Sequence, residues 1–244
     1  MRFTGRSLAV TGAASGIGRE VARRAHAEGA ALIAIDIDGP GLERLADELE
    51  ERTEAIVVDL GDGGAVDRLA AGPLAAIDVL VNDAGISDQF TPAADTDDAL
   101  WEKVLAVNLF APFRLTRGVL PGMVERGGGA IVNVCSVAAE VGAAGGAAYT
   151  VSKHGLLGLT RSVAADYGPR GVRVNAVLPG AIKTAMTSTD DALVEGADAA
   201  IGATTAGRWA QPEEVASVVL FLAGDEASFV HGSAYSVDGG WSLV

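Results

Sequence analysis

The sequence is short of cysteine and of positive charge, and each shortage argues against a class of function. Cys135 is the only cysteine among the 244 residues, so the chain can form neither an internal disulfide nor a multi-cysteine metal site. The 18 Lys and Arg residues are outnumbered by 32 Asp and Glu residues, which gives a formal net charge of -14. A surface of this charge repels phosphate backbones and anionic lipid, so nucleic-acid and membrane partners are not expected.

Long apolar runs are also missing. No uninterrupted apolar segment approaches the roughly 20 residues that a membrane span requires, and no signal segment precedes the first apolar strand. We therefore expect a soluble, cytoplasmic protein. Its 49% of hydrophobic residues are ample for the core of a globular fold. The three histidines, His26, His154 and His231, show no metal-ligand spacing, so no metal site is expected.

Short apolar runs alternate with longer amphipathic stretches along the whole chain. Because the runs are apolar at successive positions, they predict strands covered on both faces, at Ser7–Val10, Ala31–Asp36, Ala55–Val58, Val79–Asn82, Ala130–Val134, Arg173–Leu178 and Ala234–Val237. The amphipathic stretches predict helices at Ile17–Ala27, Gly41–Glu51, Ala65–Ala71, Asp97–Val124, Ala148–Tyr167 and Pro212–Leu222. The third of these helices is the weakest and could be little more than a turn.

The alternation runs without a linker or a repeat. It predicts an α/β fold in one domain over residues 1–244: a Rossmann-like, doubly wound parallel sheet of about seven strands with helices on both faces. Only Ala185–Gly207 breaks the rhythm. Its Ala, Thr, Asp and Gly content favours a mobile substrate loop or a pair of short helices.

A glycine-rich turn follows the first predicted strand, with the sequence Thr11-Gly12-Ala13-Ala14-Ser15-Gly16-Ile17-Gly18. Glycines here allow a tight turn and let the backbone approach a pyrophosphate at the helix N-terminus. The spacing G-x-x-x-G-x-G differs from the commoner G-x-G-x-x-G pattern, and such a turn can also serve only to begin a helix. The turn therefore indicates a dinucleotide site without establishing one.

The second predicted strand ends on Asp36, 18 positions after Gly18. A carboxylate here can accept hydrogen bonds from the adenosine ribose hydroxyls and would repel a 2′-phosphate. Neither Ser15 nor Ile37 supplies a cation for such a phosphate. NAD rather than NADP is therefore the predicted cofactor, although Asp36 also suits an ordinary turn at the end of a strand.

Tyr149 and Lys153 lie four residues apart in a predicted helix, which places both on one helix face. A lysine cation and a positive nicotinamide ring both favour the phenolate, so they lower the pKa of the tyrosine from its usual value of about 10. The pair can then act as a general acid/base on an alcohol or carbonyl oxygen. Taken alone, a Y-x-x-x-K pattern is more often an ordinary pair on a helix surface.

The motifs of this chain, and the order in which they follow one another, resemble those of the classical short-chain dehydrogenase/reductase family over essentially the whole chain. The matching elements are Thr11–Gly18, Asp36, Asp59 in Val57-Val58-Asp59-Leu60, Asn82-Asp83-Ala84-Gly85, Asn108, Ser136, Tyr149 with Lys153, Pro179-Gly180 and Val237-Asp238-Gly239-Gly240. Each element alone is a weak signal, whereas the ordered set is specific.

The resemblance implies four catalytic residues. Ser136 would hydrogen-bond the substrate oxygen and orient Tyr149, which would exchange a proton while hydride passes between the substrate carbon and the nicotinamide. Lys153 would hold the nicotinamide ribose and lower the pKa of the tyrosine. Asn108 would position a water that links Lys153 to solvent, although a buried amide in a long helix has an equally ordinary structural use.

The resemblance also implies the residues that bind the cofactor. Asp59 would contact the adenine and Thr184 the carboxamide end, although Asp59 also suits a turn and Thr184 a helix N-cap. The complete predicted set is Gly12, Ser15, Gly16, Ile17, Gly18, Asp36, Asp59, Leu60, Asn82, Ala84, Gly85, Tyr149, Lys153, Pro179, Gly180, Ile182 and Thr184.

One position departs from the family pattern. Asp83 stands where the family usually carries a second asparagine, and an ionised aspartate can accept but not donate a hydrogen bond. The substitution bears on cofactor affinity and local stability rather than on the tyrosine. Cys135, next to Ser136, is expected to be an inert buried thiol.

Together these features predict an NAD(H)-dependent enzyme that interconverts a secondary alcohol and a ketone. The segments expected to line the substrate pocket are Ile86–Phe90, Val137–Gly142, Ile182 and the loop after Thr184. An apolar substrate fits them better than a phosphorylated one, because Lys183 is the one cation near them. Two alternatives remain: an NAD(H)-binding sensor without turnover, and a non-carbonyl reaction on the same scaffold. The apolar faces of the two long helices, and their pairing in the family, favour a homotetramer, with a dimer as the second choice.

Overall fold

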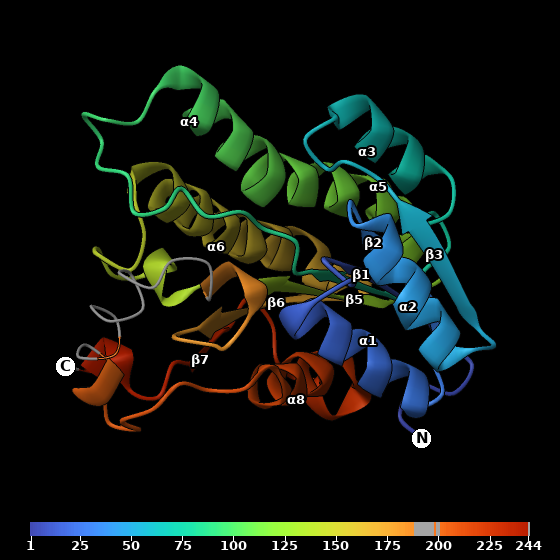
Figure 1. The fold of residues 1–244 in the computed structure, drawn as a ribbon. Coiled ribbons are helices and arrows are strands. Elements are labelled where there is room, and N and C mark those ends of the chain that lie inside the picture. The colour runs from blue at the N-terminus through green and yellow to red at the C-terminus, as the bar shows by residue number, and fades with distance from the viewer. Residues whose placement is uncertain (188–197, 199–200, 244) are drawn as a thin grey trace.

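The computed structural model describes residues 1–187, 198 and 201–243. Seven parallel strands form one sheet in the order β3-β2-β1-β4-β5-β6-β7, which confirms the predicted Rossmann-like fold (Figure 1). The strands are β1 Ser7–Thr11, β2 Ala31–Asp36, β3 Thr53–Val57, β4 Val79–Asn82, β5 Gly129–Val134, β6 Val172–Pro179 and β7 Ala234–Val237. Every predicted strand is present, with its ends within two residues of the expected ones.

Helices cover the two faces of the sheet (Figure 1). They are α1 Gly16–Ala27, α2 Gly39–Leu49, α3 Gly63–Ala71, α4 Asp98–Leu105, α5 Ala111–Glu125, α6 Ala147–Tyr167 and α8 Pro212–Ala223. Residues of α1, α2 and α8 share one core cluster with the strands, whereas α3, α5 and α6 contribute to a second cluster on the opposite face. Each face of the sheet therefore has its own hydrophobic core, as amphipathic helices on both sides require.

One predicted helix is longer than expected and another is interrupted. The weakest predicted helix, Ala65–Ala71, is confirmed as the nine-residue helix α3, and the Asp62 side chain caps its start by accepting hydrogen bonds from two backbone N–H groups. The single helix expected over Asp97–Val124 contains a π-helical turn, Ala106–Phe110, between α4 and α5. A π turn is common at functional sites, and this one contains Asn108.

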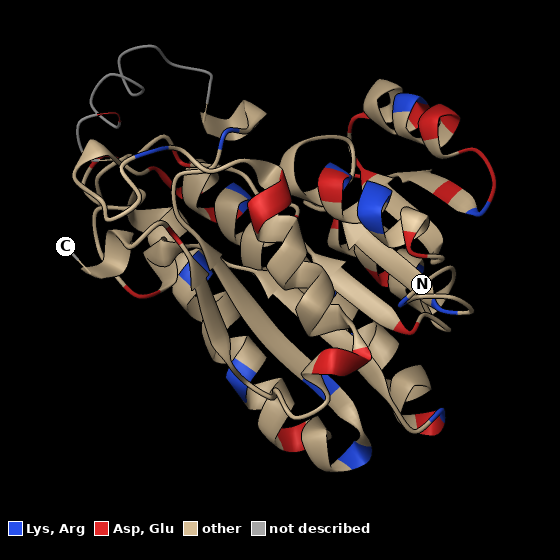
Figure 2. Ribbon diagram, turned by 90° about the horizontal axis from the view of Figure 1, so that it is seen from below, with Lys and Arg blue, Asp and Glu red and all other residues tan. Residues whose placement is uncertain are grey.

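Burial separates the centre of the sheet from its edges. The strands β1, β4 and β5 contain no charged residue (Figure 2). All residues of β4 and β6 are buried. The expectation that every strand is covered on both faces is wrong for the edge strands β3 and β7, where Val57 is 61% and Tyr235 36% exposed. An edge strand has a neighbour on one side only, so the helices protect it less completely.

Among the described residues, no helix is long and apolar enough to cross a membrane. The same part of the chain contains no group of three or more His, Cys, Asp or Glu side chains that could hold a metal ion. The cytoplasmic location and the lack of a metal stay predictions. Within Ala185–Gly207, the structure shows a 3-10 turn at Ala185–Thr187, and most of the predicted substrate loop lies outside the described residues.

Candidate active site

The carboxyl ends of the strands form a crevice where the strand order reverses, between β1 and β4. Open parallel sheets bind ligands at this switch point, because the loops diverge there to opposite faces of the sheet. A cavity of about 540 Å³ occupies this position. Its walls come from the glycine-rich turn, the ends of β2, β4, β5 and β6, and the start of α6.

The glycine-rich turn brings bare backbone to the cavity. Gly12 and Gly16 have φ angles of 73° and 54°, which residues with a side chain rarely adopt. A Cβ on Gly12 would lie 3.0 Å from the Ala84 backbone, and one on Gly16 would lie 3.2 Å from the Thr184 side chain. Because Ser15, the N-cap of α1, makes no side-chain capping bond, this helix start fits the phosphates of a dinucleotide.

Asp36 is held facing the glycine-rich turn. Its Oδ2 atom accepts a 3.0 Å hydrogen bond from the Ala14 N–H, and Oδ1 accepts one of the same length from the Asp38 N–H. Two fixed backbone donors therefore orient the carboxylate at the end of β2, where it lines the cavity. Asp59 lines the same region, and its side chain also accepts a 2.7 Å bond from the Gly61 N–H.

Asp83 lies beneath the glycine-rich turn. Its Oδ2 atom would be 2.7 Å from a Cβ on Gly18, and its carboxylate accepts a hydrogen bond from the Gly18 N–H. Burial raises the pKa of the Asp83 carboxyl to about 7, against the lowering effects of Lys153 and of the Gly18 N–H. The substituted position therefore puts a titratable group against the glycine-rich turn, where the family pattern has an amide.

Tyr149, Lys153 and Ser136 line the opposite end of the cavity. Lys153 is buried, donates a 3.0 Å hydrogen bond from Nζ to the Val134 carbonyl, and places Nζ 5.5 Å from the centre of the Tyr149 ring. The Ser136 hydroxyl accepts a 3.1 Å bond from the Ala138 N–H. The helix spacing expected from the sequence therefore places the aromatic ring and the ammonium group side by side.

Cys135 also lines the cavity, next to Ser136. The thiol is only 3% exposed, and burial raises its pKa to about 12. The thiolate is the reactive form, so a raised pKa disfavours reaction at this cysteine. Its burial agrees with the sequence-based expectation, and its inertness stays a prediction.

Asn108 and Asn82 are buried behind the cavity rather than in its wall. Asn108 accepts a hydrogen bond from the Ile86 N–H at 2.9 Å and donates to the Ile86 carbonyl at 3.0 Å. The Asn82 side chain donates to Asn133 at 2.8 Å, and Asn133 donates in turn to Thr160. Both amides therefore support the strands and loops that carry the site.

Most of the predicted site residues come together at this one cavity. The described residues that line it include Gly12, Ser15, Gly16, Ile17, Asp36, Asp59, Leu60, Ala84, Gly85, Ser136, Tyr149, Lys153, Pro179, Gly180, Ile182 and Thr184. Those outside its lining are Gly18, Asn82 and Asn108. Met186, in the predicted substrate loop, lines it as well. Sequence reasoning did not include Lys103 or Val107, which also line it, because only the folded arrangement brings these separate segments together.

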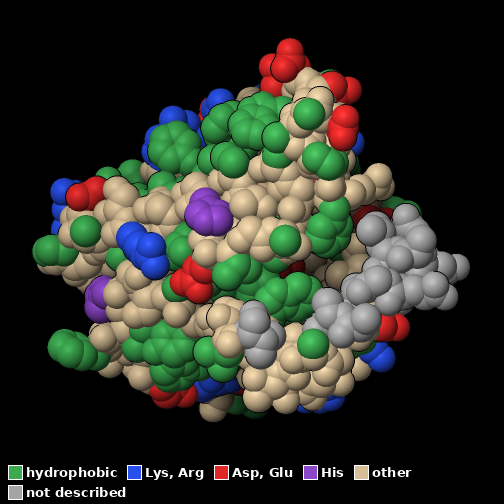
Figure 3. Space-filling view, turned by 90° about the vertical axis from the view of Figure 1, so that its left-hand side faces the viewer, with side chains coloured by type: hydrophobic (Ala, Val, Ile, Leu, Met, Phe, Trp, Pro, Cys, Tyr) green, Lys and Arg blue, Asp and Glu red, His purple; other side chains and the backbone are tan. Residues whose placement is uncertain are grey.

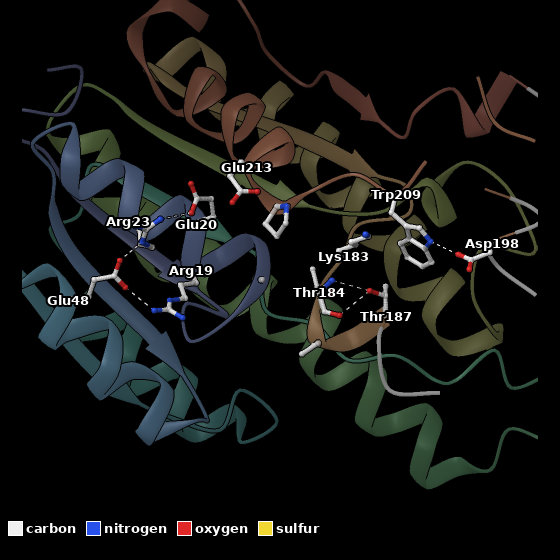
Figure 4. Close-up of a pocket in the computed structure, with 13 residues that line it drawn as sticks. Arg19, Glu20, Arg23, Glu48, Lys183, Thr184, Thr187, Asp198, Trp209 and Glu213 are labelled. Carbon is white, nitrogen blue, oxygen red and sulfur yellow. Dashed lines mark hydrogen bonds and ion pairs between the residues drawn. The ribbon is translucent and has the colours of Figure 1, made fainter. Parts of the chain in front are cut away.

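A second cavity of about 980 Å³ adjoins the first and is also lined by Gly16 and Thr184 (Figure 4). Part of its charged lining is paired internally: Arg19 and Arg23 both bond the carboxylate of Glu48. The described residues that line it do not include Tyr149. Although it is larger, this cavity offers no matching set of chemical groups, so the smaller one is the candidate active site.

Known proteins resemble this chain over its whole length. Residues 12–242 match the family model described as enoyl-(acyl carrier protein) reductase. The galactitol 2-dehydrogenase (L-tagatose-forming) of Cereibacter sphaeroides is 41% identical over 99% of this chain and 97% of its own. The 3beta-hydroxysteroid dehydrogenase 2 of Eggerthella lenta is 36% identical over 98% of this chain and 96% of its own.

A solved structure agrees with these sequence matches. It is a putative NAD(P)-dependent gluconate 5-dehydrogenase from Beutenbergia cavernae with NADP bound at low occupancy, and it is 41% identical to this chain. The two structures superpose with a TM-score of 0.91 over 99% of this chain and 98% of the other. From the order of its motifs, its fold and these similarities, the chain belongs to the short-chain dehydrogenase/reductase family.

Proposed function

We propose that this protein transfers hydride between NAD(H) and a secondary alcohol or ketone, with Tyr149 as the general acid/base. The observation that carries the proposal is the shared cavity: Tyr149, Lys153 and Ser136 line its one end, and the glycine-rich turn with Asp36 lines the other. The similarity to dehydrogenases of hydroxyl compounds supports an oxidoreductase that acts on CH–OH groups.

Each catalytic residue has a role that its position supports. The bound nicotinamide supplies the hydride acceptor or donor. The Tyr149 hydroxyl takes the proton from an alcohol or gives it to a ketone, and the Ser136 hydroxyl hydrogen-bonds the same substrate oxygen. The ammonium group of Lys153, beside the Tyr149 ring, stabilises the negative charge that the tyrosine oxygen carries between these events.

The preference for NAD rests on Asp36. Its carboxylate is fixed by the Ala14 and Asp38 N–H groups, so it cannot easily turn away from the adenosine ribose. A 2′-phosphate at this place would meet a like charge, whereas the ribose hydroxyls would find an acceptor. The solved relative from Beutenbergia cavernae has NADP bound. The preference of this chain for NAD over NADP is therefore tested by measuring the affinity for both cofactors.

Fluorescence titration with NADH and with NADPH tests the cofactor, and oxidation by NAD of galactitol, gluconate and a 3β-hydroxysteroid tests the reaction. We expect NADH to bind at least about tenfold more tightly than NADPH, and at least one alcohol to be oxidised. Tighter NADPH binding would refute the cofactor assignment. NADH binding without turnover of any of these alcohols would favour the sensor alternative.

We also propose that the protein assembles as a homotetramer, with a dimer as the second choice. Apolar side chains form several patches on the face drawn in Figure 3. On the surface of α5, of the π turn before it and of α6, Phe113, Phe110 and Val151 are 43%, 51% and 46% exposed. Burial of these side chains against another copy of the chain would stabilise a homo-oligomer. Light scattering coupled to gel filtration would measure the mass of the assembly.

A further inference from the structure

We propose that Asp88 is a positioning residue that holds Tyr149 in place by capping the N-terminus of α6 from a separate loop. The inference rests on the proposed role of Tyr149. Asp88 lies in the loop after β4, some 60 residues before Tyr149. It is not one of the described residues that line the cavity. It is nevertheless 1% exposed, so its carboxylate is a buried group that needs partners.

Both carboxylate oxygens of Asp88 bond the start of the catalytic helix. Oδ1 accepts a 2.9 Å hydrogen bond from the Gly146 N–H, and Oδ2 accepts a 2.9 Å bond from the Tyr149 N–H. The N-cap of α6 is Gly146, which has no side chain to satisfy these donors. Asp88 therefore does from another segment what an N-cap side chain ordinarily does within the helix.

The neighbouring backbone completes the cap. The Ala147 N–H donates to the Thr91 carbonyl at 3.1 Å, and the Thr91 N–H donates to the Asp88 carbonyl at the same distance. The first turn of α6 is thus held at three backbone N–H groups by residues 88–91. Such a cap fixes where the first turn begins, and Tyr149 lies in that turn.

The backbone carbonyl of Tyr149 is tied to the same loop. The Ser152 hydroxyl donates to this carbonyl at 2.7 Å and accepts a 3.2 Å bond from the Asn108 amide. Asn108 in turn holds both backbone groups of Ile86, two residues before Asp88. Because both the N–H and the C=O of Tyr149 are fixed through residues 86–88, the tyrosine has a defined place relative to β4.

Two glycines leave the space that this arrangement needs. A Cβ on Gly145 would lie 2.5 Å from Cδ1 of Tyr149, and a Cβ on Gly146 would lie 2.5 Å from Oδ2 of Asp88. Side chains at these positions would displace the ring or the cap. Gly145 and Gly146 therefore help to position Tyr149, in addition to allowing the chain to begin α6.

Fluorine NMR tests the proposal without a substrate. The chain has three tyrosines, so biosynthetic 3-fluorotyrosine gives three resonances, and Tyr149→Phe assigns the one of interest. Asp88→Asn keeps the size of the side chain, but its amide NH₂ replaces one of the two acceptor oxygens and so faces a backbone N–H of α6. Asp88→Ala removes both acceptors. Asp97→Ala is the matched control, because Asp97 caps α4 through the Leu100 N–H at 2.8 Å.

We expect both Asp88 variants to shift or broaden the Tyr149 resonance and to leave those of Tyr167 and Tyr235 in place. With the best alcohol from the three named above, kcat should fall about 10- to 100-fold, because small displacements of a catalytic group are costly. NADH affinity should stay within about twofold, since Asp88 is outside the cofactor end of the cavity. Asp97→Ala should change neither the Tyr149 resonance nor kcat.

An unchanged Tyr149 resonance in Asp88→Asn would overturn the proposal, and so would an equal disturbance of all three resonances, which means a general loss of structure. If Asp88→Ala does not fold, Asp88→Asn decides alone. A shifted Tyr149 resonance in a protein that binds NADH but oxidises none of the three alcohols would support the positioning, while favouring the sensor alternative over the proposed function. If the unmodified protein oxidises an alcohol but the Tyr149 resonance is unchanged in the Asp88 variants, the positioning role is refuted and the proposed function stands.

Discussion

The two ends of the candidate active site are built differently. At the cofactor end, the glycine-rich turn within Thr11–Gly18 brings bare backbone to the cavity, and Asp36 lies at the end of the adjacent strand. The tyrosine end combines β5, α6 and the loop after β4, which are distant in sequence. At the first end the backbone provides the site, whereas at the second a network of side chains positions it. Substitutions at the two ends should therefore affect different properties of the enzyme.

The largest effect should come from Tyr149→Phe at the tyrosine end. Removing the hydroxyl removes the proposed proton donor and acceptor, so kcat should fall by about a thousandfold or more. The ring still packs as before, and NADH affinity should change by less than about twofold. Steady-state rates and NADH fluorescence measure the two quantities. Turnover within tenfold of the unmodified enzyme would mean that another residue moves the proton.

Asp36→Ala at the cofactor end should produce the opposite pattern. NADH should bind about 10- to 100-fold more weakly and NADPH relatively better, because the ribose loses its acceptor and the repulsion is gone. At saturating NAD, kcat should be nearly unchanged. Asp62→Ala is a suitable control, since Asp62 caps α3 and does not line the cavity. Unaltered selectivity in Asp36→Ala would place the determinant elsewhere.

The smallest effect concerns Asp83, which lies close to both ends. With its pKa near 7, the carboxyl is neutral below about pH 7 and negative above it. A negative charge beside the glycine-rich turn repels the cofactor phosphates, so NADH affinity should fall up to about tenfold from pH 6 to pH 8. Asp83→Asn should remove this dependence, and parallel pH profiles of the two proteins would contradict the assignment.

The same carboxyl should affect folding stability with a definite sign. The unfolded chain releases this proton near pH 3.8 and the folded chain near pH 7. Between these values the folded state binds more protons, so the free energy of unfolding falls as pH rises, by up to about 1.4 kcal/mol per pH unit, and levels off above about pH 7. Urea unfolding of the cofactor-free protein and of Asp83→Asn from pH 5 to pH 8 would measure the difference.

The sequence was sufficient for the order of the elements and for the parallel sheet. Apolar runs such as Val79–Asn82 and the glycine-rich turn are local patterns, and local patterns fix strands, turns and helix starts. The same patterns predicted α3 as the weakest helix, because the Asp62 cap at its start is not part of an apolar pattern. They missed the π turn around Asn108, whose side chain bonds a loop 22 residues earlier. The single domain and the individual site roles stay predictions.

By itself, then, the sequence determined which residues can carry the chemistry: the four-residue spacing of Tyr149 and Lys153 fixes a shared helix face wherever that helix lies. Only the tertiary structure decided how that helix is held. The spacing between Asp88 and Tyr149 matches no helix or strand period, and their contact exists because the fold brings the loop after β4 against the start of α6. A helix period is a property of neighbouring residues, whereas a cap supplied by another segment depends on the packing of the whole chain.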